Sequence, residues 1–394
     1  MPRRAIRPWI AGAAATALAL APLAANPALA RGRAPSAAKP AAYTFGVAMP
    51  MTGSQASYGA DQVQALMWAV QFINSHGGVD GVPLKPIVED TQADPQLGIN
   101  DVNKLISLYH VPAFITAWSS VVAAVAPIAN RHHVLELSIG ANDPSIAHLG
   151  PYVWTTYPLA NVDITALAKY VYTNLHDRTA AVLYIDNATG IYGAQVFRNV
   201  FQQMGGKVVA FEAYPQNTTS YTAQLLKVKA ANPQVLHIQG LVQDTLAVIA
   251  QARELGITSQ ITSYSAADNP QLLKQDGAAA NGLIVTALAP SQGPQLRHYL
   301  ALWQSRAHRL PNGLPYTEYL YDAPFILKAQ ILWLIQHHLA YTGPNLLKAM
   351  QANPRVVTPL TGLTVFNPNH TVDKPVYLLK AVHGQFVQIA KLPG

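Results

Sequence analysis

Short apolar runs and longer stretches of helical periodicity alternate along almost the whole chain, and this alternation constrains the fold most. The first series predicts strands at 44–49, 84–89, 113–116 and 134–138, with helices between them at 59–74, 95–108 and 121–130. Strands that alternate with helices form crossover units, which build parallel sheets covered by helices on both faces. The first series therefore predicts a doubly wound α/β unit.

A second series of the same kind follows the first. It predicts strands at 180–185, 208–213, 235–238 and 261–264, with helices at 162–174, 192–204, 221–230 and 244–255. Helices return at 295–306, 318–339 and 346–351, and strands at 364–366, 376–381 and 386–389. We expect the late helices to complete the first unit. Two such units predict two lobes with a cleft, and ligands of open parallel sheets bind beyond the carboxyl ends of the strands.

The first thirty residues have the composition of a secretory signal peptide. Three arginines precede an apolar run from Ile10 to Ala25, and Ala28-Leu29-Ala30 follows, so we expect cleavage after Ala30. Residues 31–42 are small and Pro-containing and predict a flexible leader. The chain has no cysteine, which excludes disulfides, a thiolate metal site and a lipid-bearing cysteine. We therefore expect a chain free in the periplasm.

Length bears on the number of domains, and net charge bears on the class of function. Without the signal, 394 − 30 = 364 residues remain, more than the roughly 250 to 300 at which single cores stop growing. The net charge of +7 falls to 7 − 3 = +4 without the three signal arginines. No dense basic stripe interleaved with aromatic residues is present, which disfavours nucleic-acid binding.

Two serines stand at the turn between the predicted strand 113–116 and the next helix. The segment Thr116-Ala117-Trp118-Ser119-Ser120 leads directly into apolar residues. A helix start has unpaired backbone N–H groups and a partial positive charge, so this turn is suited to hold a carboxylate. A serine here can also be an ordinary N-cap, and both interpretations stay open.

A similar turn, Gly140-Ala141-Asn142-Asp143-Pro144, follows the next predicted strand. Its small residues allow a ligand to approach the backbone, although the segment alone is also typical of an ordinary turn. Apolar ligand pockets contain aromatic walls and a few polar anchors. The aromatic residues at predicted loop positions are Tyr58, Trp118, Tyr157, Tyr192 and Tyr264.

Motifs for catalysis and metal binding are missing from the sequence. It has no G-x-S-x-G, no H-E-x-x-H, no G-x-x-x-x-G-K and no G-x-G-x-x-G after a strand. The histidine pairs at 132–133 and 337–338 have no partners at helical spacing, and we interpret them as solvent-facing. We expect a protein that is not an enzyme and has no catalytic residue, cofactor or metal.

Several short segments, taken in their order and spacing, resemble one known family. They are Met51-Thr52-Gly53 with Tyr58-Gly59, Ile73 to Gly81, Glu89 to Pro95, Ser138 to Pro144, Tyr192-Gly193, Tyr321-Asp322-Ala323, Gly362 to Phe366 and His383 to Val387. The chain resembles the periplasmic branched-chain amino-acid (Leu/Ile/Val) binding proteins of ABC transporters from about Tyr43 to Ile389. The ending also fits a hairpin turn at His383-Gly384 between the last two predicted strands.

The resemblance implies the type I periplasmic binding fold, an α/β architecture of two doubly wound lobes joined by three hinge crossings. The crossings would lie near Ala160, Leu288 and Phe366. The implied division is residues 43–160 plus 289–366 for lobe 1, and residues 161–288 plus 367–394 for lobe 2.

The resemblance also implies which residues face the ligand. The matching positions are Ser119 and Ser120 in the serine turn that holds an amino acid's carboxylate, Ala141 and Asn142 in a neighbouring backbone clamp, and Tyr58 and Tyr192 in aromatic walls from the two lobes. Trp118, Ser265 and Asp268 complete the predicted ligand-binding site.

Departures from the family pattern bear on the ligand. Where relatives for amino acids place an acidic residue against the ligand's ammonium, this chain has Ser265, with Asp268 nearby. At a position of the second lobe where relatives have an aromatic residue, this chain has Leu241 or Val242. Where threonine is common in relatives, this chain has Asn142. A buried ammonium without its carboxylate costs about 2 to 5 kcal/mol. Unless Asp268 reaches the ligand, a small organic or aromatic acid or an amide fits better than an amino acid.

We therefore expect an extracytoplasmic solute-binding protein of an ABC transporter. It would bind an amino acid or a related small organic acid or amide between its lobes, close about its hinges, and deliver the ligand to membrane permease subunits. We expect a periplasmic monomer without a lipid anchor. The alternative is a ligand sensor of the same fold that signals to a partner protein, and an enzyme of unknown type is a third hypothesis.

Overall fold

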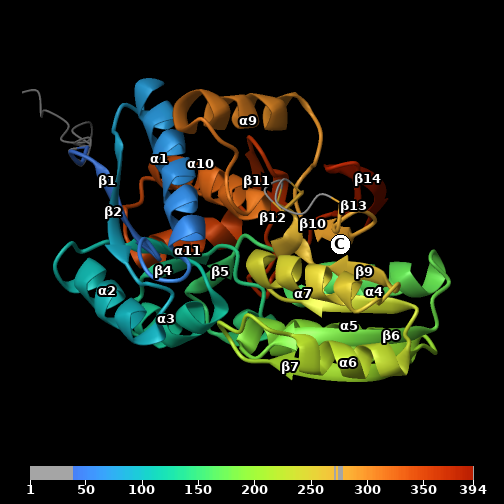
Figure 1. Cartoon of the computed structure of the whole chain (residues 1–394). Helices are drawn as coiled ribbons and strands as arrows, with labels where there is room; N and C mark the ends of the chain where they lie inside the picture. Colours follow the sequence, from blue (N-terminus) through green and yellow to red (C-terminus); the bar gives the residue numbers. More distant parts are fainter. Residues whose placement is uncertain (1–38, 270–271, 274–277, 394) are drawn as a thin grey trace, which may run out of the picture. The chain divides into compact units, whose positions relative to one another are not determined.

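The computed structural model describes residues 39–269, 272–273 and 278–393. The predicted signal peptide, residues 1–30, and residues 31–38 of the predicted leader lie outside the described residues. The described chain forms two main sheets and a two-stranded ribbon, with helices around them (Figure 1). None of the helices in these ranges is both long and apolar enough to cross a membrane.

The first sheet has five parallel strands in the order β2-β1-β3-β4-β5. The strands are β1 (Tyr43–Met49), β2 (Leu84–Asp90), β3 (Ala113–Thr116), β4 (Leu135–Ser138) and β5 (Val153–Thr155). The connecting helices are α1 (Ala56–Ser75), α2 (Pro95–Ser107), α3 (Ser119–His132) and the 3-10 helix η1 (Pro144–His148). Parallel neighbours need such crossovers, as the alternating sequence pattern predicts.

The second sheet has seven strands in the order β14-β13-β10-β9-β8-β6-β7. The strands are β6 (Thr179–Ile185), β7 (Lys207–Tyr214), β8 (Val235–Gln239), β9 (Gln260–Ser263), β10 (Ile284–Ala287), β13 (Val376–Val382) and β14 (Gln385–Leu392). The helices are α4 (Ala160–Thr173), α5 (Ala188–Gln203), α6 (Thr222–Ala231), α7 (Val242–Glu254) and the 3-10 helix η2 (Ser265–Ala267). Strands β6 to β10 are parallel, whereas β13 is antiparallel to β10 and β14.

The remaining elements lie between β10 and β13 in the chain. They are α9 (Pro294–Ala307), α10 (Leu314–Gln336), α11 (Gly343–Ala352) and the ribbon of β11 (Arg355–Thr358) and β12 (Gly362–Val365). Helix α10 lies beside α1 (Figure 1), and its Leu327 shares one apolar core with Val47 of β1. These helices therefore complete the unit around the first sheet, as expected.

Both sheets are covered by helices on both faces, because successive strand residues point to opposite sides. In β6, Val182 packs into a core with Phe197 of α5, whereas the next residue, Leu183, packs into another core with Ile249 of α7. In β3, Ile115 belongs to the core that contains α1 and α10, and its neighbour Phe114 to the core of α2 and α3. The predicted doubly wound architecture is confirmed.

The structure corrects several predicted boundaries. Three strands were not predicted, namely β5, β10 and β11. Helices α1, α3, α5 and α10 begin two to four residues before the predicted starts at 59, 121, 192 and 318. Apolar periodicity marks the buried middle of a helix, while its first turn here is polar or lies at a turn signal. The predicted hairpin turn at His383-Gly384 is confirmed between β13 and β14.

Candidate ligand-binding site

A small cavity of about 50 Å³ lies between the N-terminal ends of helices that flank the two sheets. Its lining residues come from the starts of α1, α3, α5, α7 and α10, from the loops after β3 and β4, and from η2 after β9. They are Gln55, Tyr58, Gln62, Ala117, Trp118, Ser119, Gly140, Thr189, Leu241, Tyr264, Ala266 and Tyr316. The cavity thus occupies the place beyond the strands' carboxyl ends where ligands of such sheets bind. We call it the interlobe cavity.

The start of α3 presents unpaired backbone donors to this cavity. Trp118 is the N-cap of α3, and its carbonyl accepts a 2.9 Å hydrogen bond from the N–H of Val122. Among the described residues no side chain caps the helix, so the N–H groups of its first turn stay available. Trp118 has φ 63° and ψ 118°, a backbone conformation that bulky residues rarely adopt and that concentrates at functional sites. This helix start is suited to hold an anion.

The loop after β4 lies against the same helix start. The Oγ of Ser119 accepts a 3.3 Å hydrogen bond from the N–H of Asp143, and Asp143 caps η1 by accepting from the N–H of Ser145 at 2.8 Å. Asn142 is buried, and its carbonyl accepts a 2.7 Å hydrogen bond from the N–H of Ala160. The side-chain Oδ1 of Asn142 has no partner among the described residues. This loop fixes Ser119 and leaves one amide oxygen unpaired.

The aromatic lining residues are Tyr58, Trp118, Tyr264 and Tyr316, and Tyr157 contacts Tyr316 from outside the lining. Tyr157 and Tyr316 stack with ring centroids 5.3 Å apart, and the Tyr157 hydroxyl donates a 2.8 Å hydrogen bond to the Oγ of Ser265. Tyr58 extends from α1 to pack against the apolar core under the second sheet. Burial raises the pKa of Tyr58 and of Tyr316 above the ordinary value, so both are neutral hydroxyls. The aromatic walls thus come from elements around both sheets, and they contain no ionised group.

Three buried carboxyl groups lie near this region but do not line the cavity. Burial raises the pKa of Asp163 to about 6 and that of Asp268 to about 7. Burial also raises the pKa of Glu318, helped by the nearby Asp268. Asp163 accepts a 2.9 Å hydrogen bond from Thr286. At neutral pH, these groups include protonated carboxyls.

The structure brings some of the predicted site residues together and separates others. Tyr58, Trp118 and Ser119 line the cavity. The predicted residues outside the lining are Ser120, the exposed second residue of α3; Ala141 and Asn142, buried beyond Gly140; Ser265, bonded to Tyr157; Asp268, buried after η2; and Tyr192, on α5 with 43% of its surface exposed.

Sequence reasoning missed several lining residues, of which Tyr316 is the most important. It lies in the first turn of α10, ahead of the predicted start of that helix. Gly313 and Pro315 carry a signal that could have found it, because proline in the first turn of a helix is a frequent start mark. Gln55, Gln62, Thr189 and Ala266 were also missed, since nothing in their local pattern separates them from other polar or small residues.

The fold is that of a two-lobed protein, and elements around both sheets line the interlobe cavity. A family model described as periplasmic binding protein matches residues 42–385, and the chain belongs to this family. The resemblance to the branched-chain amino-acid binding proteins is confirmed, and so is the expectation that the chain is a binding protein and not an enzyme. The family is extracytoplasmic.

Individual relatives share this fold at low identity. The leucine-, isoleucine-, valine-, threonine- and alanine-binding protein of Pseudomonas aeruginosa is 26% identical over 280 residues, which are 70% of this chain and 74% of the relative. A branched-chain amino acid transporter substrate-binding protein of Streptococcus pneumoniae, solved with isoleucine, has a TM-score of 0.79 at 19% identity and covers 90% of this chain and 99% of its own.

A second solved structure similar to this chain holds a different kind of ligand. It is a solute-binding protein of an ABC transporter from Rhodopseudomonas palustris in complex with 3,4-dihydroxybenzoic acid. Its TM-score is 0.79 at 20% identity, and the match covers 90% of this chain and 98% of that one. The same fold therefore accommodates amino acids and aromatic acids in different proteins.

Proposed function

We propose that the interlobe cavity binds a small carboxylate that lacks an amino group, with aromatic acids as the foremost class. The observation that carries this proposal is the lining itself. It combines the uncapped start of α3 with aromatic walls, and it includes no side chain of Asp, Glu, Lys, Arg or His among the described residues. An anion finds backbone donors here, whereas a cation finds no charged partner.

The carboxylate would bind at the start of α3. Backbone N–H groups of Ser119 and Ser120 and the positive end of the helix dipole favour a negative charge, and the serine hydroxyls add donors. Ser120 is part of this proposal although it does not line the present cavity. Gly140 and Ala141 leave the neighbouring backbone open to the ligand, and Asn142 offers an amide for a second polar group.

The rest of the ligand would be planar and apolar or hydroxylated. Tyr58, Trp118, Tyr264 and Tyr316 supply aromatic faces for a ring. The buried Oε1 of Gln62 has no partner among the described residues, so a ligand hydroxyl would give it one. Tyr192 would reach the ligand only after a movement of α5, and we keep it as a prediction.

An ammonium group on the ligand would be costly. Ser265 stands where relatives for amino acids place an acidic residue, and its hydroxyl is bonded to Tyr157. Asp268 is buried outside the lining, with its pKa raised to about 7 by burial. An ammonium without a carboxylate loses about 2 to 5 kcal/mol on burial. The Rhodopseudomonas relative, with its bound aromatic acid, makes such a ligand reasonable for this fold.

We further infer how the chain divides into lobes and how the lobes and the transporter use this site. Lobe 1 would comprise residues 43–160 and 289–366, and lobe 2 residues 161–288 and 367–394. Ligand would enter the open form and the lobes would close over it, after which membrane permease subunits would receive the closed monomer. The transporter names of the similar structures favour this role over signalling. Cleavage after Ala30 would release the chain to the periplasm without a lipid anchor.

A thermal-shift panel tests the proposed ligand class. The panel would pair phenylacetates and branched 2-oxo acids with the amino acids of the same carbon skeletons, and would also contain hydroxybenzoates. A ligand at 100 times its dissociation constant adds about 2.7 kcal/mol to stability, enough to raise the melting temperature measurably. We expect shifts with the amine-free acids. Shifts confined to the amino acids would refute the proposed ligand class while keeping the cavity as the site.

A further inference from the structure

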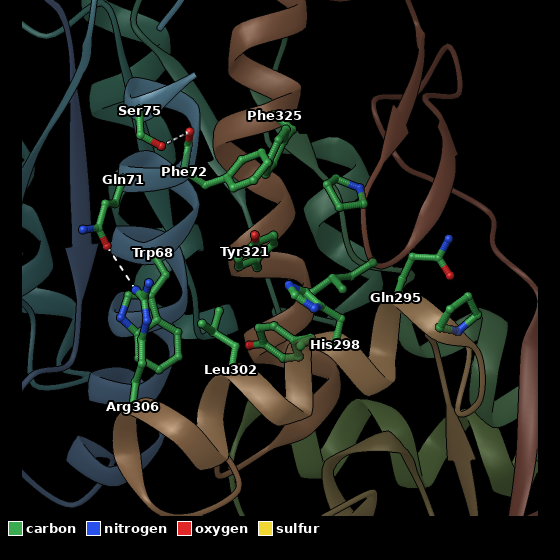
Figure 2. A pocket seen from close by; sticks show the side chains of 14 residues that line it. Trp68, Gln71, Phe72, Ser75, Gln295, His298, Leu302, Arg306, Tyr321 and Phe325 are labelled. Atoms are coloured by element: carbon green, nitrogen blue, oxygen red, sulfur yellow. Dashed lines mark hydrogen bonds between the residues drawn. The ribbon is translucent and has the colours of Figure 1, made fainter. Parts of the chain in front are cut away.

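A second and larger cavity opens between α1, α9 and α10 and the loop before β12 (Figure 2). Its volume is about 630 Å³, against about 50 Å³ for the interlobe cavity, and the two share no lining residue. Ligand pockets for drug-sized molecules span about 300 to 1,000 Å³. This cavity is therefore large enough for a small-molecule ligand.

Five aromatic residues contribute to its walls. Trp68 and Phe72 come from α1, Tyr299 from α9, and Tyr321 and Phe325 from α10. The centroids of Tyr299 and Tyr321 lie 5.4 Å apart at 68°, and those of Phe72 and Phe325 lie 6.2 Å apart. Phe72 exposes 48% of its surface, although it lies beside the ring of Phe325. These walls are suited to a planar apolar body.

Arg306 is the charged side chain among the described residues that line this cavity. Arg306 lies over Trp68, with 5.5 Å between its guanidinium carbon and the ring centroid, and donates one 3.1 Å hydrogen bond to the Oε1 of Gln71. It has no carboxylate within ion-pair distance among the described residues, so further guanidinium donors remain for a ligand. His298 is a second basic side chain in the lining, which includes no Asp or Glu.

Asp322 follows the lining residue Tyr321 in α10, but it forms no ion pair with Arg306 of α9. The carboxylate of Asp322 accepts hydrogen bonds from the N–H of Leu360, at 3.1 Å, and of Thr361, at 2.6 Å, and is buried. Its oxygens are thus occupied by backbone donors of the loop between β11 and β12. In Figure 2, Arg306 and Trp68 lie together on one side, across Leu302 and Tyr321 from His298 and Gln295.

We propose that this cavity is a second binding site, for an apolar aromatic carboxylate whose carboxylate pairs with Arg306 and whose ring lies between the aromatic walls. A cationic ligand would meet two basic side chains and no acid. A neutral apolar ligand would cover Arg306 without giving it a partner, which costs free energy. A planar aromatic carboxylate can form two parallel hydrogen bonds with the guanidinium of Arg306 while its ring packs against the aromatic walls.

Fluorine NMR of the full chain labelled with 5-fluorotryptophan tests this site separately from the interlobe cavity. Trp68 reports on the second site and Trp118 on the interlobe cavity, and the Trp68→Phe and Trp118→Phe variants assign the two resonances. The probe is 2-naphthoate, and its neutral isostere 2-naphthamide is the control ligand. We expect 2-naphthoate to shift the Trp68 resonance in a saturable way, and 2-naphthamide to leave it unshifted at equal concentration.

Matched variants identify the charge partner. Arg306→Gln should weaken naphthoate binding by about tenfold, since it removes a charge-assisted bidentate contact. Arg306→Lys, which keeps the charge, should lose less. Arg297→Gln removes the same charge from an exposed position of α9 outside the lining, and should leave the affinity unchanged.

Three results would overturn the proposal: no shift of the Trp68 resonance, equal shifts with the acid and the amide, or an unchanged affinity in Arg306→Gln. The Trp118 resonance is read in the same spectra and reports on the interlobe cavity independently of Trp68. The proposed function of the interlobe cavity is therefore tested by its own signal, whichever of these results is obtained for the second site.

Discussion

Two glycines leave room for the tyrosines that form the interlobe cavity. A Cβ at Gly313 would lie 2.8 Å from Cδ1 of Tyr58 and 3.1 Å from Cδ2 of Tyr316, and a Cβ at Gly140 would lie 2.8 Å from Cδ1 of Tyr316. Both glycines have positive φ, 63° and 73°, where a side chain is also disfavoured by the backbone. The tyrosine positions therefore depend on residues without side chains.

Gly313→Ala should displace Tyr58 and weaken ligand binding by about tenfold, because overpacking of a filled site typically costs 1 to 3 kcal/mol. The matched control is Gly384→Ala, which has φ 78° and no atom within 4 Å of the added Cβ. Both variants should lose about 1 kcal/mol of stability through backbone strain. Calorimetric titration and thermal unfolding measure the two effects. Equal affinities of the two variants would contradict the role given to Gly313.

The hydrogen bond from Tyr157 to Ser265 joins elements that belong to different proposed lobes. Tyr157→Phe should reduce ligand affinity about fivefold, since the closed form loses a bond that contributes about 1 kcal/mol. Tyr341→Phe serves as control, because the Tyr341 hydroxyl donates to the carbonyl of Thr44 within one lobe, at 3.1 Å. The control should lose similar stability and keep the wild-type affinity. A loss of affinity in both variants would argue against closure as the cause.

At the scale of residues, sequence reasoning predicted two residues at the start of α3 that line the cavity, but missed Tyr316 in its walls. Trp118 and Ser119 follow a buried strand and open a helix, a local signal that needs no tertiary knowledge. Tyr316 is distant in sequence from both, and only the packing of α10 on α1 brings it to the cavity. Tyr192 was predicted from its loop position and from the resemblance, and its exposure on α5 leaves that role a prediction.

Among the elements, α2 has a well-defined start. Asp94 is its N-cap, with a side chain that accepts hydrogen bonds from the N–H of Gln96 at 2.8 Å and of Leu97 at 2.9 Å, and Pro95 is the first helical residue. Both features are N-terminal signals that satisfy or remove unpaired donors. The predicted start of this helix at Pro95 is confirmed.

Asp94→Ala should lower the free energy of unfolding by about 1 kcal/mol, because two backbone donors lose their acceptor. Asp94→Asn retains an acceptor oxygen and should lose only a fraction of that amount. Chemical denaturation measures both. A loss in the asparagine variant as large as in the alanine variant would assign the effect to the charge and not to the cap.

The long periodic helices were predicted, whereas some of the short strands were not. Helices such as α2 and α7 have apolar periodicity over several turns. Strands β5 and β10 have three and four residues, all buried, and no alternation that identifies them. Their pairing with β4, β9 and β13 makes them strands, and that pairing is a property of the folded chain.

For the molecule as a whole, buried carboxyl groups link stability to pH. Glu136 is fully buried in β4, where its Oε1 accepts a 2.8 Å hydrogen bond from Thr116 and its Oε2 has no partner among the described residues. Burial raises the pKa of Glu136 from 4.5 to about 8. A raised acid pKa means that the folded state holds the proton more tightly than the unfolded state does.

The contribution of Glu136 should therefore be fully present below pH 4.5 and be lost as the pH rises toward about 8. Glu136→Gln keeps an acceptor for Thr116 and carries no ionisable group. We expect its stability relative to wild type to increase between pH 5 and pH 8 by a few kcal/mol, on the order given by the shift. Denaturation at several pH values measures the difference, and a difference that is constant across this range would contradict the assignment.

The central claim is that the interlobe cavity takes a carboxylate without an amino group. It is tested most directly by titrating the chain, labelled with 5-fluorotryptophan, with 4-hydroxyphenylacetate and with 4-hydroxyphenylglycine, which differ only in the amino group. We predict that the Trp118 resonance responds to the acetate at a concentration about 100-fold lower, given the cost of an unpaired buried ammonium. A Trp118 resonance that responds first to the glycine derivative would contradict the claim and would give Asp268 the role of ammonium partner.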